Sequence, residues 1–315
     1  MTGRAVVWIL GAALLAAGCA SGPRQMRVNV PLLDVRSQPR TPAHAEAHDP
    51  EQETQLFYFE PVEVKQRQDG WALIAAPEQP EFSHHKHWEG YPGWVREQSL
   101  IRPEYAFTPT VVVRVPWATS YEDAHLRAPS ATAFPLGARL YAVDIAGAQW
   151  RVELADGSFV WLPRESALSL EALGRLSAAQ RRQLILATAA QVLGAPYFWG
   201  GRSTQSGFDC SGLVNVSYRV AGVDVPRDAH EQSLRAQAVS APQPADLIFL
   251  SEKDRPARIV HVMLYAGGEE VLEAPGTGLN VRRVTLRERL GHPLADLASG
   301  TVVKGQTVTF GTYLE

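Results

Sequence analysis

One stretch of the chain, residues 197–214 with the sequence YFWGGRSTQSGFDCSGLV, limits its structure more than any other. It places Cys210 after a glycine-rich turn and before an apolar run that Gly222 ends, which predicts a helix beginning at the cysteine. A cysteine in the first helical turn faces unpaired backbone N–H groups and the positive end of the helix dipole, and both favour the nucleophilic thiolate. An isolated cysteine is more often a small buried hydrophobe, so the surrounding sequence decides between these interpretations.

The whole chain has the composition of an ordinary folded protein. Its 315 residues allow two or three domains, and the shares of hydrophobic (45%) and charged (20%) residues suit packed cores. The net charge is −3 and no block of lysine or arginine stands out. A nucleic acid partner is therefore not expected.

The N-terminus has the pattern of an export signal. Residues 5–17 form an apolar run of the size of a secretory signal core, too short to span a bilayer comfortably. Cys19, preceded by small residues, resembles a bacterial lipoprotein processing site, which implies a lipid-anchored protein of the cell envelope, on the periplasmic side. Ala16 stands where such sites usually have leucine, so ordinary signal cleavage is the alternative. We expect an exported protein with a signal peptide over residues 1–22, and lipidation of Cys19 would leave Cys210 without a disulfide partner.

Residues 23–105 and 106–168 are predicted to form two small β domains. Both contain a strand, a strand with tryptophan, a turn, and a further strand with glycine or tryptophan, which suggests two tandem small barrels. The dipeptide Asp156–Gly157 is a strong hairpin signal in the second domain. The strand candidates are 27–35, 56–64, 71–76 and 93–95 in the first domain and 111–115, 139–143, 149–154 and 159–162 in the second.

Two proline-containing stretches of the first domain, residues 37–53 and 77–92, are predicted surface loops. The second holds His84, His85 and His87, and three close histidines could bind a metal ion. However, they lack the i, i+4 spacing of helical metal ligands, include a lysine between them and lie in a proline-rich loop. We therefore expect no specific metal site there.

From residue 169 the sequence changes to helical spacing. Ser177 is a candidate N-cap and Gly194 a candidate stop for one or two amphipathic helices. The helix at Cys210 and a series of strands follow, so residues 169–315 are predicted to form an α+β domain with an antiparallel sheet. The strand candidates are 246–250, 259–266, 270–274 and 280–284, with short ones near 302–303 and 308–310.

A histidine and a carboxylate beyond Cys210 complete a candidate catalytic set. His261 lies in the strand-like run IVHVMLYA and Glu273 in EEVLEA, and each is six positions from Gly267. A hairpin centred on Gly267 would place them opposite each other, with side chains about 5 Å apart. The carboxylate would then hold one imidazole nitrogen while the other faces Cys210, as a cysteine hydrolase requires. A strand histidine alone is more often a core residue, but the three groups together favour catalysis.

The pattern PYFWGG…GFDCSGLV…VPR…ADLIFL…HVMLYAGG resembles the NlpC/P60 cysteine peptidases of bacterial cell-wall metabolism, over about residues 177–315. The resemblance implies a papain-like α+β fold for residues 169–315, and neither a metal nor a cofactor. The two preceding β domains and the run GYPGWV are similar, more narrowly, to γ-D-glutamyl-L-diamino-acid endopeptidases of the dipeptidyl-peptidase VI type, which carry bacterial SH3-type domains.

The resemblance also implies roles for individual residues. Cys210 matches the nucleophile, His261 the general base and Tyr197 a residue near the oxyanion site. Glu273 matches the third catalytic position, where many members have histidine, and a carboxylate would pair more strongly with imidazolium. The flanking residues Asp209 and Ser211, and Trp199 in the run PYFWGG, match substrate-contacting positions.

A further set of positions implies selection of a free amine. Asp228 matches a carboxylate that lines the pocket for the N-terminal residue of the substrate. In the subgroup with SH3-type domains, Tyr91 of GYPGWV and a nearby acid, for which Glu60 is the candidate, would hold the ammonium of an N-terminal L-Ala. A buried ammonium needs carboxylate or hydroxyl partners, and a wall behind it rejects longer stems.

Three functions remain open from the sequence. The leading one is hydrolysis of the γ-D-Glu–diamino acid bond in murein stem peptides with free L-Ala, as in murein peptide recycling. The second is the same chemistry on intact peptidoglycan, with the SH3-like domains as wall binders. The third is an inactive wall-binding scaffold, supported only by the departures at Glu273, Ala229 (usually small and polar) and Ala245 (usually glycine).

Overall fold

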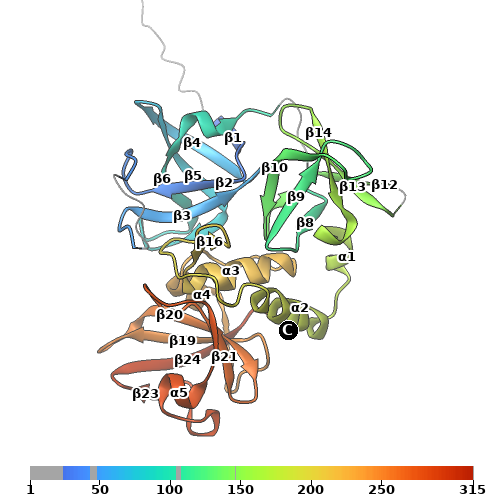
Figure 1. Cartoon of the computed structure of the whole chain (residues 1–315). Coiled ribbons are helices and arrows are strands. Elements are labelled where there is room, and N and C mark those ends of the chain that lie inside the picture. Colours follow the sequence, from blue (N-terminus) through green and yellow to red (C-terminus); the bar gives the residue numbers. More distant parts are fainter. Residues whose placement is uncertain (1–23, 43–47, 104–107, 146, 315) are drawn as a thin grey trace, which may run out of the picture.

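The computed structural model of the chain describes residues 24–42, 48–103, 108–145 and 147–314. Cys19 and the predicted signal peptide lie outside the described residues. Figure 1 shows a first β module (residues 24–101) and a second β module (residues 111–169) above an α+β domain (residues 170–314). No helix in the described ranges is long and apolar enough to cross a membrane.

The first β module is one antiparallel sheet with the strand order β3-β2-β6-β5-β4-β1-β7. The predicted strands 27–35 and 56–64 were wrong in extent, because each is divided by a turn, the second at Phe59 with a φ of +67°. Both divisions return the chain into the same sheet. The strands are β1 (Arg24–Val28), β2 (Leu32–Arg36), β3 (Gln52–Phe57), β4 (Pro61–Gln68), β5 (Trp71–Glu81), β6 (Glu89–Arg96) and β7 (Leu100–Ile101).

Strands β5 and β6 form a long hairpin, so the predicted loop 77–92 was also wrong in extent. The strand pairs shift between Ala76–Tyr91 and Pro80–Gly90, which marks a β-bulge. Proline cannot donate to a strand ladder, and the bulge leaves Pro77 outside the pairing. The hairpin therefore continues through the proline-containing stretch, and its tip is only residues 82–88.

The second β module combines a five-stranded sheet, β10-β9-β14-β13-β12, with a three-stranded one, β11-β8-β15. The predicted Asp156–Gly157 turn is confirmed, since it joins β13 and β14 and Gly157 has a φ of +80°. The strands are β8 (Val111–Val113), β9 (Trp117–Tyr121), β10 (Pro129–Pro135), β11 (Arg139–Leu140), β12 (Ala142–Ile145), β13 (Gln149–Glu153), β14 (Phe159–Pro163) and β15 (Ala167–Ser169).

The α+β domain places helices against the antiparallel sheet β18-β24-β19-β20-β21-β22, as predicted. The predicted helix start at Cys210 is confirmed, and Ser177 forms a capping box with Gln180. Two short helices, α4 and α5, were not predicted. The elements are α1 (Leu170–Gly174), α2 (Ala178–Ala190), β16 (Arg202–Ser203), β17 (Gly207–Phe208), α3 (Cys210–Val220), α4 (Ala229–Arg235), β18 (Gln237–Ala238), β19 (Leu247–Glu252), β20 (Arg255–Gly267), β21 (Glu270–Glu273), β22 (Arg282–Thr285), α5 (Leu286–Leu290), β23 (Val302–Val303) and β24 (Gln306–Thr312).

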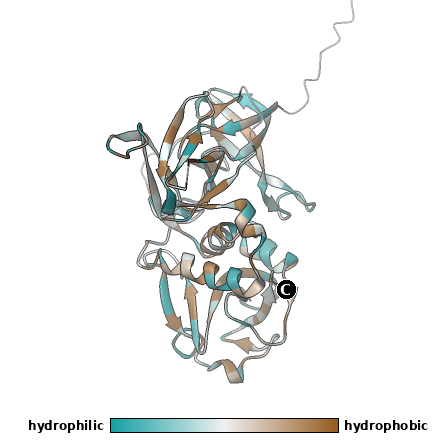
Figure 2. Cartoon of the chain, turned by 90° about the vertical axis from the view of Figure 1, so that its right-hand side faces the viewer, coloured by the Kyte–Doolittle hydropathy of each residue, from teal (hydrophilic) through white to brown (hydrophobic). Residues whose placement is uncertain are grey.

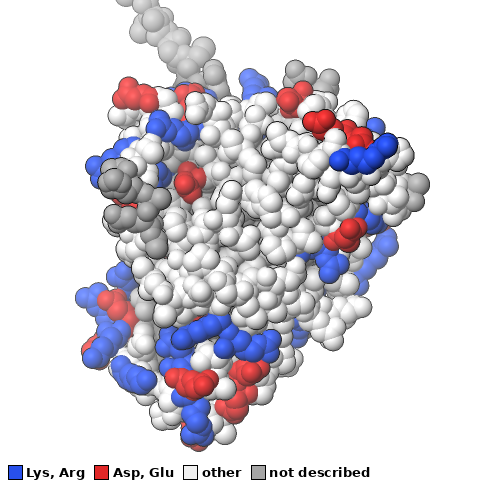
Figure 3. Space-filling model, viewed as in Figure 1, with Lys and Arg blue, Asp and Glu red and all other residues white. Residues whose placement is uncertain are grey.

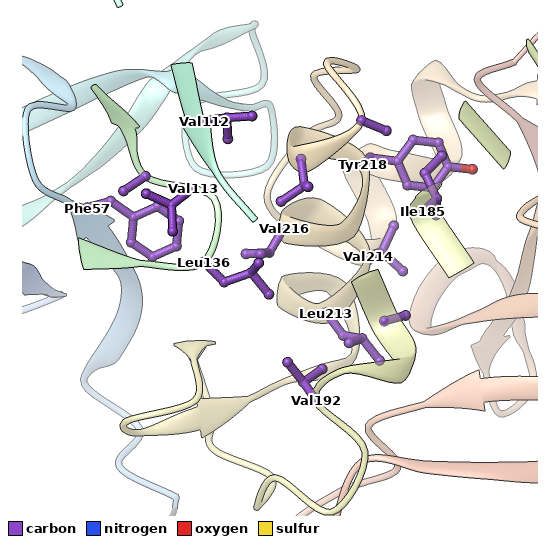
Figure 4. Packing of buried hydrophobic residues seen from close by; sticks show 14 of the residues in the cluster. Phe57, Val112, Val113, Leu136, Ile185, Val192, Leu213, Val214, Val216 and Tyr218 are labelled. Carbon is purple, nitrogen blue, oxygen red and sulfur yellow. The ribbon is translucent and has the colours of Figure 1, made fainter. Parts of the chain in front are cut away.

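Helix α3 lies at the centre of a hydrophobic core that all three parts share. Figure 4 shows Val216 of α3 near Leu136 of the second module and Phe57 of the first. In Figure 2, helices separate the β-rich upper part from the lower sheet, and in Figure 3 charged side chains of both signs surround a wide uncharged area. Because every face of α3 is buried, the helix that begins with Cys210 is held by the whole molecule.

Candidate active site

A cavity of about 830 Å³ lies between the first β module and the α+β domain. The α+β domain contributes Cys210, His261 and Tyr197, and the first module contributes Tyr91 and other side chains of the β5–β6 hairpin. No residue of the second module lines it, among the residues that the structure describes. The cavity therefore joins the predicted catalytic group to only one of the two β modules.

The glycine-rich turn fixes the start of α3. Asp209 is the N-cap, and its carboxylate accepts hydrogen bonds from the backbone N–H of Gly212 (2.6 Å) and Gly200 (2.9 Å). A Cβ atom at Gly212 would lie 2.1 Å from the carbonyl oxygen of Gly201, so only glycine allows the turn to pack there. This packing places Cys210 in the first turn of α3, facing the cavity.

Arg227, which is fully buried, organises the residues on both sides of Cys210. Its guanidinium donates to Asp209 Oδ2 (2.7 Å) and to Ser211 Oγ (2.9 Å). Asp209 and Ser211 both line the cavity, but their polar atoms are engaged with the protein. Their substrate contacts remain predictions.

His261 lies in β20, at the middle of the sheet, with Glu273 beside it. Its Nε2 is 2.8 Å from Glu273 Oε2, which leaves Nδ1 for the hydrogen bond with Cys210. Burial alone would lower the pKa of His261, but the hydrogen bonds to Cys210 and Glu273 and their negative charges raise it to about 9. The ring is therefore held as imidazolium at neutral pH, with Nδ1 directed at Cys210.

The predicted hairpin between His261 and Glu273 is present, but the predicted pairing was wrong. Leu264 pairs with Leu272, so Glu273 lies two residues away from the position opposite His261. The turn is at residues 268–269, and a bulge near Gly267 shifts the register. A shift of two residues keeps a side chain on the same face, and long side chains reach diagonal neighbours.

Two arginines that sequence reasoning missed hold the Glu273 carboxylate. Arg282 lies 2.7 Å from Oε1 and Arg289 lies 2.8 Å from Oε2. Burial would raise the pKa of Glu273, but hydrogen bonds and charges from His261 and Arg289 lower it to about 2. Arg282 is directly opposite Glu273 in the pairing of β21 with β22, so counting along that predicted strand pair could have found it.

At the other end of the cavity, Tyr91 lies between two carboxylates. Its hydroxyl is 2.9 Å from Oδ2 of Asp228 and 3.3 Å from Oε2 of Glu53. Burial raises the pKa of Asp228, and the negative charges of Asp209 and Glu231 raise it further. The positive charge of Arg227 opposes them, and the resulting pKa is about 7. This end of the cavity can hold a cation, since a positive charge would stabilise both carboxylates.

Glu60, the predicted amine-binding acid, lies outside the cavity, and Glu53 occupies that place. The Glu60 side chain is 2% exposed and contacts the buried Arg202 (3.2 Å) and Arg219 (3.5 Å). The turn at Phe59 directs it into this ion cluster. Glu53 fell within the predicted loop 37–53, and no signal in the sequence distinguishes it from the other acids of that loop.

The two predicted aromatic residues of the glycine-rich run line the cavity in different ways. Tyr197 is buried, and burial together with the charges of Asp209 and Cys210 raises its pKa, so its hydroxyl keeps the proton and can donate to an oxyanion. Trp199 is 42% exposed, and its ring centroid is 5.0 Å from that of His48. It offers an apolar surface at the cavity edge.

Comparison with known proteins agrees with this geometry. Residues 194–291 match the model of the NlpC/P60 family. The γ-D-glutamyl-L-lysine dipeptidyl-peptidase of Bacillus subtilis (strain 168) is 30% identical over 247 residues, which cover 76% of this chain and 77% of the relative. The chain belongs to the NlpC/P60 family. It is thus related to cysteine peptidases that act on the bacterial cell wall, with a papain-like catalytic domain.

Two further comparisons show how far the similarity extends. The murein DD-endopeptidase MepH of Escherichia coli (strain K12) is 37% identical over 103 residues, which cover 31% of this chain and 38% of that protein. The crystal structure of an NlpC/P60 family protein from Bacillus cereus ATCC 10987 has a TM-score of 0.71 at 21% identity, and covers 93% of this chain and 100% of that one. The fold is therefore shared over nearly the whole described chain, including the β modules.

Proposed function

We propose that the chain is a cell-wall cysteine endopeptidase that hydrolyses the bond between γ-D-Glu and the diamino acid of murein stem peptides with a free N-terminal L-Ala. One observation carries this proposal: Tyr91, Asp228 and Glu53 meet at one end of the cavity that also contains Cys210. Two carboxylates and a hydroxyl suit an ammonium group, and the β5–β6 hairpin beside them would act as a wall that rejects a longer stem.

The chemistry would proceed in two steps. The Cys210 thiolate attacks the γ-carbonyl carbon, and the backbone N–H of Cys210 with the Tyr197 hydroxyl stabilises the oxyanion. The His261 imidazolium then gives its proton to the leaving amine of the diamino acid as the C–N bond breaks, which leaves a thioester. His261 next takes a proton from water, the resulting hydroxide attacks the thioester, and the dipeptide L-Ala-γ-D-Glu leaves with its new carboxylate.

The relatives and the charges in the cavity support this choice of substrate. Two relatives that align with most of this chain, from Bacillus subtilis and Bacillus cereus, are named γ-D-glutamyl-L-lysine dipeptidyl-peptidase. Arg258 and Arg289 line the cavity on the side of His261, where they could meet the carboxylates of a stem peptide. The cavity would therefore bind opposite charges at its two ends.

The rest of the chain would anchor the protein in the envelope and control access to the cleft. We propose that residues 23–105 and 106–168 are SH3-type domains and that residues 169–315 form the peptidase domain. The first of these domains would close the cleft. Cys19 would carry the lipid that anchors the protein in the envelope, where short stem peptides are recycled.

A peptide cleavage assay tests the proposal. The purified chain should release L-Ala-γ-D-Glu from L-Ala-γ-D-Glu-L-Lys, and Cys210→Ala should abolish this release. The matched substrate with an acetylated N-terminus should be cleaved at least about 100-fold less efficiently, because the amide cannot pair with Asp228 and Glu53. Retained turnover in Cys210→Ala would refute the mechanism, and equal cleavage of the acetylated peptide would refute the selection for a free amine.

A further inference from the structure

The tip of the β5–β6 hairpin brings together three groups that the proposed reaction does not use. Glu81 and Glu89 pair directly across the two strands, and His85 lies in the turn between them. One ligand atom from each, a carboxylate oxygen or a ring nitrogen, lies within 4.8 Å of the other two. His84 and His87, which the sequence pattern grouped with His85, are not members of this set.

A second observation, a buried carboxylate oxygen without a partner, points to a ligand at this cluster. Glu81 is 1% exposed, and its Oε1 has no hydrogen-bond partner among the described residues. Its other oxygen, Oε2, accepts from the backbone N–H of His84 (3.0 Å) and lies 2.8 Å from His84 Nδ1. A buried carboxylate oxygen without a partner is costly, and like charges directly opposite in a sheet repel each other.

We propose that Glu81, His85 and Glu89 bind a divalent transition-metal ion, of which Zn²⁺ is the best match. One imidazole and two carboxylates are ligands that Zn²⁺ accepts, and three protein ligands with a water molecule complete its usual tetrahedral coordination. The ion would supply the missing partner of Glu81 and neutralise the two opposed carboxylates. The contact of His85 Nδ1 with Glu89 shows that these two members of the set already approach each other.

The proposed metal site lies at the turn that forms part of the cavity wall. Ser83, His84 and Lys86, which lie in the turn between the metal ligands, all line the cavity. A bound ion would fix this turn and therefore the wall near the amine-binding group Tyr91. The effect on substrate binding rests on the proposed function, but the binding of the ion itself does not.

The test measures ion binding and catalysis separately. Binding of Zn²⁺ to the full chain, without a histidine tag and treated with a chelator, is measured by isothermal titration calorimetry in a Cys210→Ala background, so that the thiol cannot bind the ion. We expect one ion per chain. His85→Asn and Glu81→Gln should each weaken Zn²⁺ binding by roughly 100-fold. Loss of a residue that only supports a metal ligand costs up to about 100-fold in affinity, and loss of a ligand itself should cost at least as much. His87→Asn, a matched change in the same turn, should alter it less than about twofold.

The His85→Asn variant separates loss of the metal site from loss of folding. The His85 side chain is 60% exposed, so the variant should unfold at the same temperature as the parent protein without metal. With Cys210 intact, Zn²⁺ at a ratio of one per chain should lower the KM for the tripeptide in the parent protein and leave it unchanged in His85→Asn. Absence of binding, equal binding in His85→Asn, or loss of binding in His87→Asn instead would each overturn the metal site. An unchanged KM with normal binding would overturn only its link to the cavity.

Discussion

Both β modules pack on helix α3, yet among the described residues only the first module lines the cavity. In the first module, the β5–β6 hairpin extends past its sheet and places Tyr91 and the tip 82–88 beside the catalytic group. In the second, β13 and β14 have only five residues each, and no described residue of their hairpin lines the cavity. A difference in the length of one hairpin therefore distinguishes a module that shapes a substrate site from one that only supports α3.

The two modules also attach differently to the α+β domain. Arg202, which is fully buried, donates to the Gln55 carbonyl oxygen (2.6 Å) and pairs with Glu60 of the first module. The charged contact of the second module, Arg139 with Asp224, involves a carboxylate that is 56% exposed. The second module is otherwise attached by hydrophobic packing around α3 and by hydrogen bonds that Arg219 and Thr204 donate to the carbonyl oxygens of Gly137 (2.8 Å) and Pro116 (3.2 Å).

The largest expected effect is a loss of stability, and it should differ between the interfaces of the two modules. Arg202→Ala should lower the free energy of unfolding by about 3–5 kcal/mol, because it leaves Glu60 buried with one partner fewer. Asp224→Ala, which removes the charged contact with the second module, should lower it by at most about 1 kcal/mol, since this carboxylate is largely exposed. Urea denaturation of both variants measures the difference, and equal losses would show that burial does not distinguish the interfaces.

The next effect concerns binding. Tyr91→Phe should raise the KM for the free-amine tripeptide about 10- to 100-fold with little change in kcat, because a hydrogen bond to charged groups is worth about 1.5–3 kcal/mol. Tyr121→Phe in β9 of the second module removes the same hydroxyl without touching the cavity and should leave KM unchanged. Steady-state kinetics of the two variants tests this, and a similar KM for both would contradict the assignment of Tyr91.

The pH dependence of substrate binding should be set by Asp228, which lies beside Tyr91 of the first module. The pKa of Asp228 is about 7, so its carboxylate is charged above pH 7 and becomes protonated below it. We expect kcat/KM for the free-amine tripeptide to fall about tenfold per pH unit below pH 7, as the ionised partner of the ammonium is lost. Asp228→Asn should remove this limb of the profile, and a parent-like limb in that variant would assign it to another group.

The smallest effect is expected in the second module. Gly157 has a φ of +80°, and a Cβ atom added there would meet no other atom within 4 Å. Gly157→Ala should therefore cost only the backbone strain, about 1–2 kcal/mol of unfolding free energy. KM and kcat for the tripeptide should stay unchanged. A change in KM would show that the second module does communicate with the cavity.

Local signals predicted much of the fold and the site. The helix at Cys210, the N-cap at Ser177 and the turn at Asp156–Gly157 each depend on a few neighbouring residues, and all three are present. The meeting of His261 with Glu273 was also predictable, because a side chain displaced by two positions stays on the same face of a strand.

Long-range features were not predictable from the sequence. The choice between Glu53 and Glu60 depends on the turn at Phe59, and the extent of the β5–β6 hairpin depends on a bulge beside Pro77. Arg202, which is fully buried, pairs with Glu60, 142 residues away in the chain. Residue type and spacing do not specify such partners, because only the packed fold decides which buried charges meet.

The central position of α3 limits how this protein can change. This helix carries the nucleophile at one end. Along its length it packs against hydrophobic residues from all three parts of the molecule. A peptidase part produced alone would expose Val216 and Arg219 to water where the β modules now cover them. A module taken from a relative would therefore have to match the α3 residues that it covers.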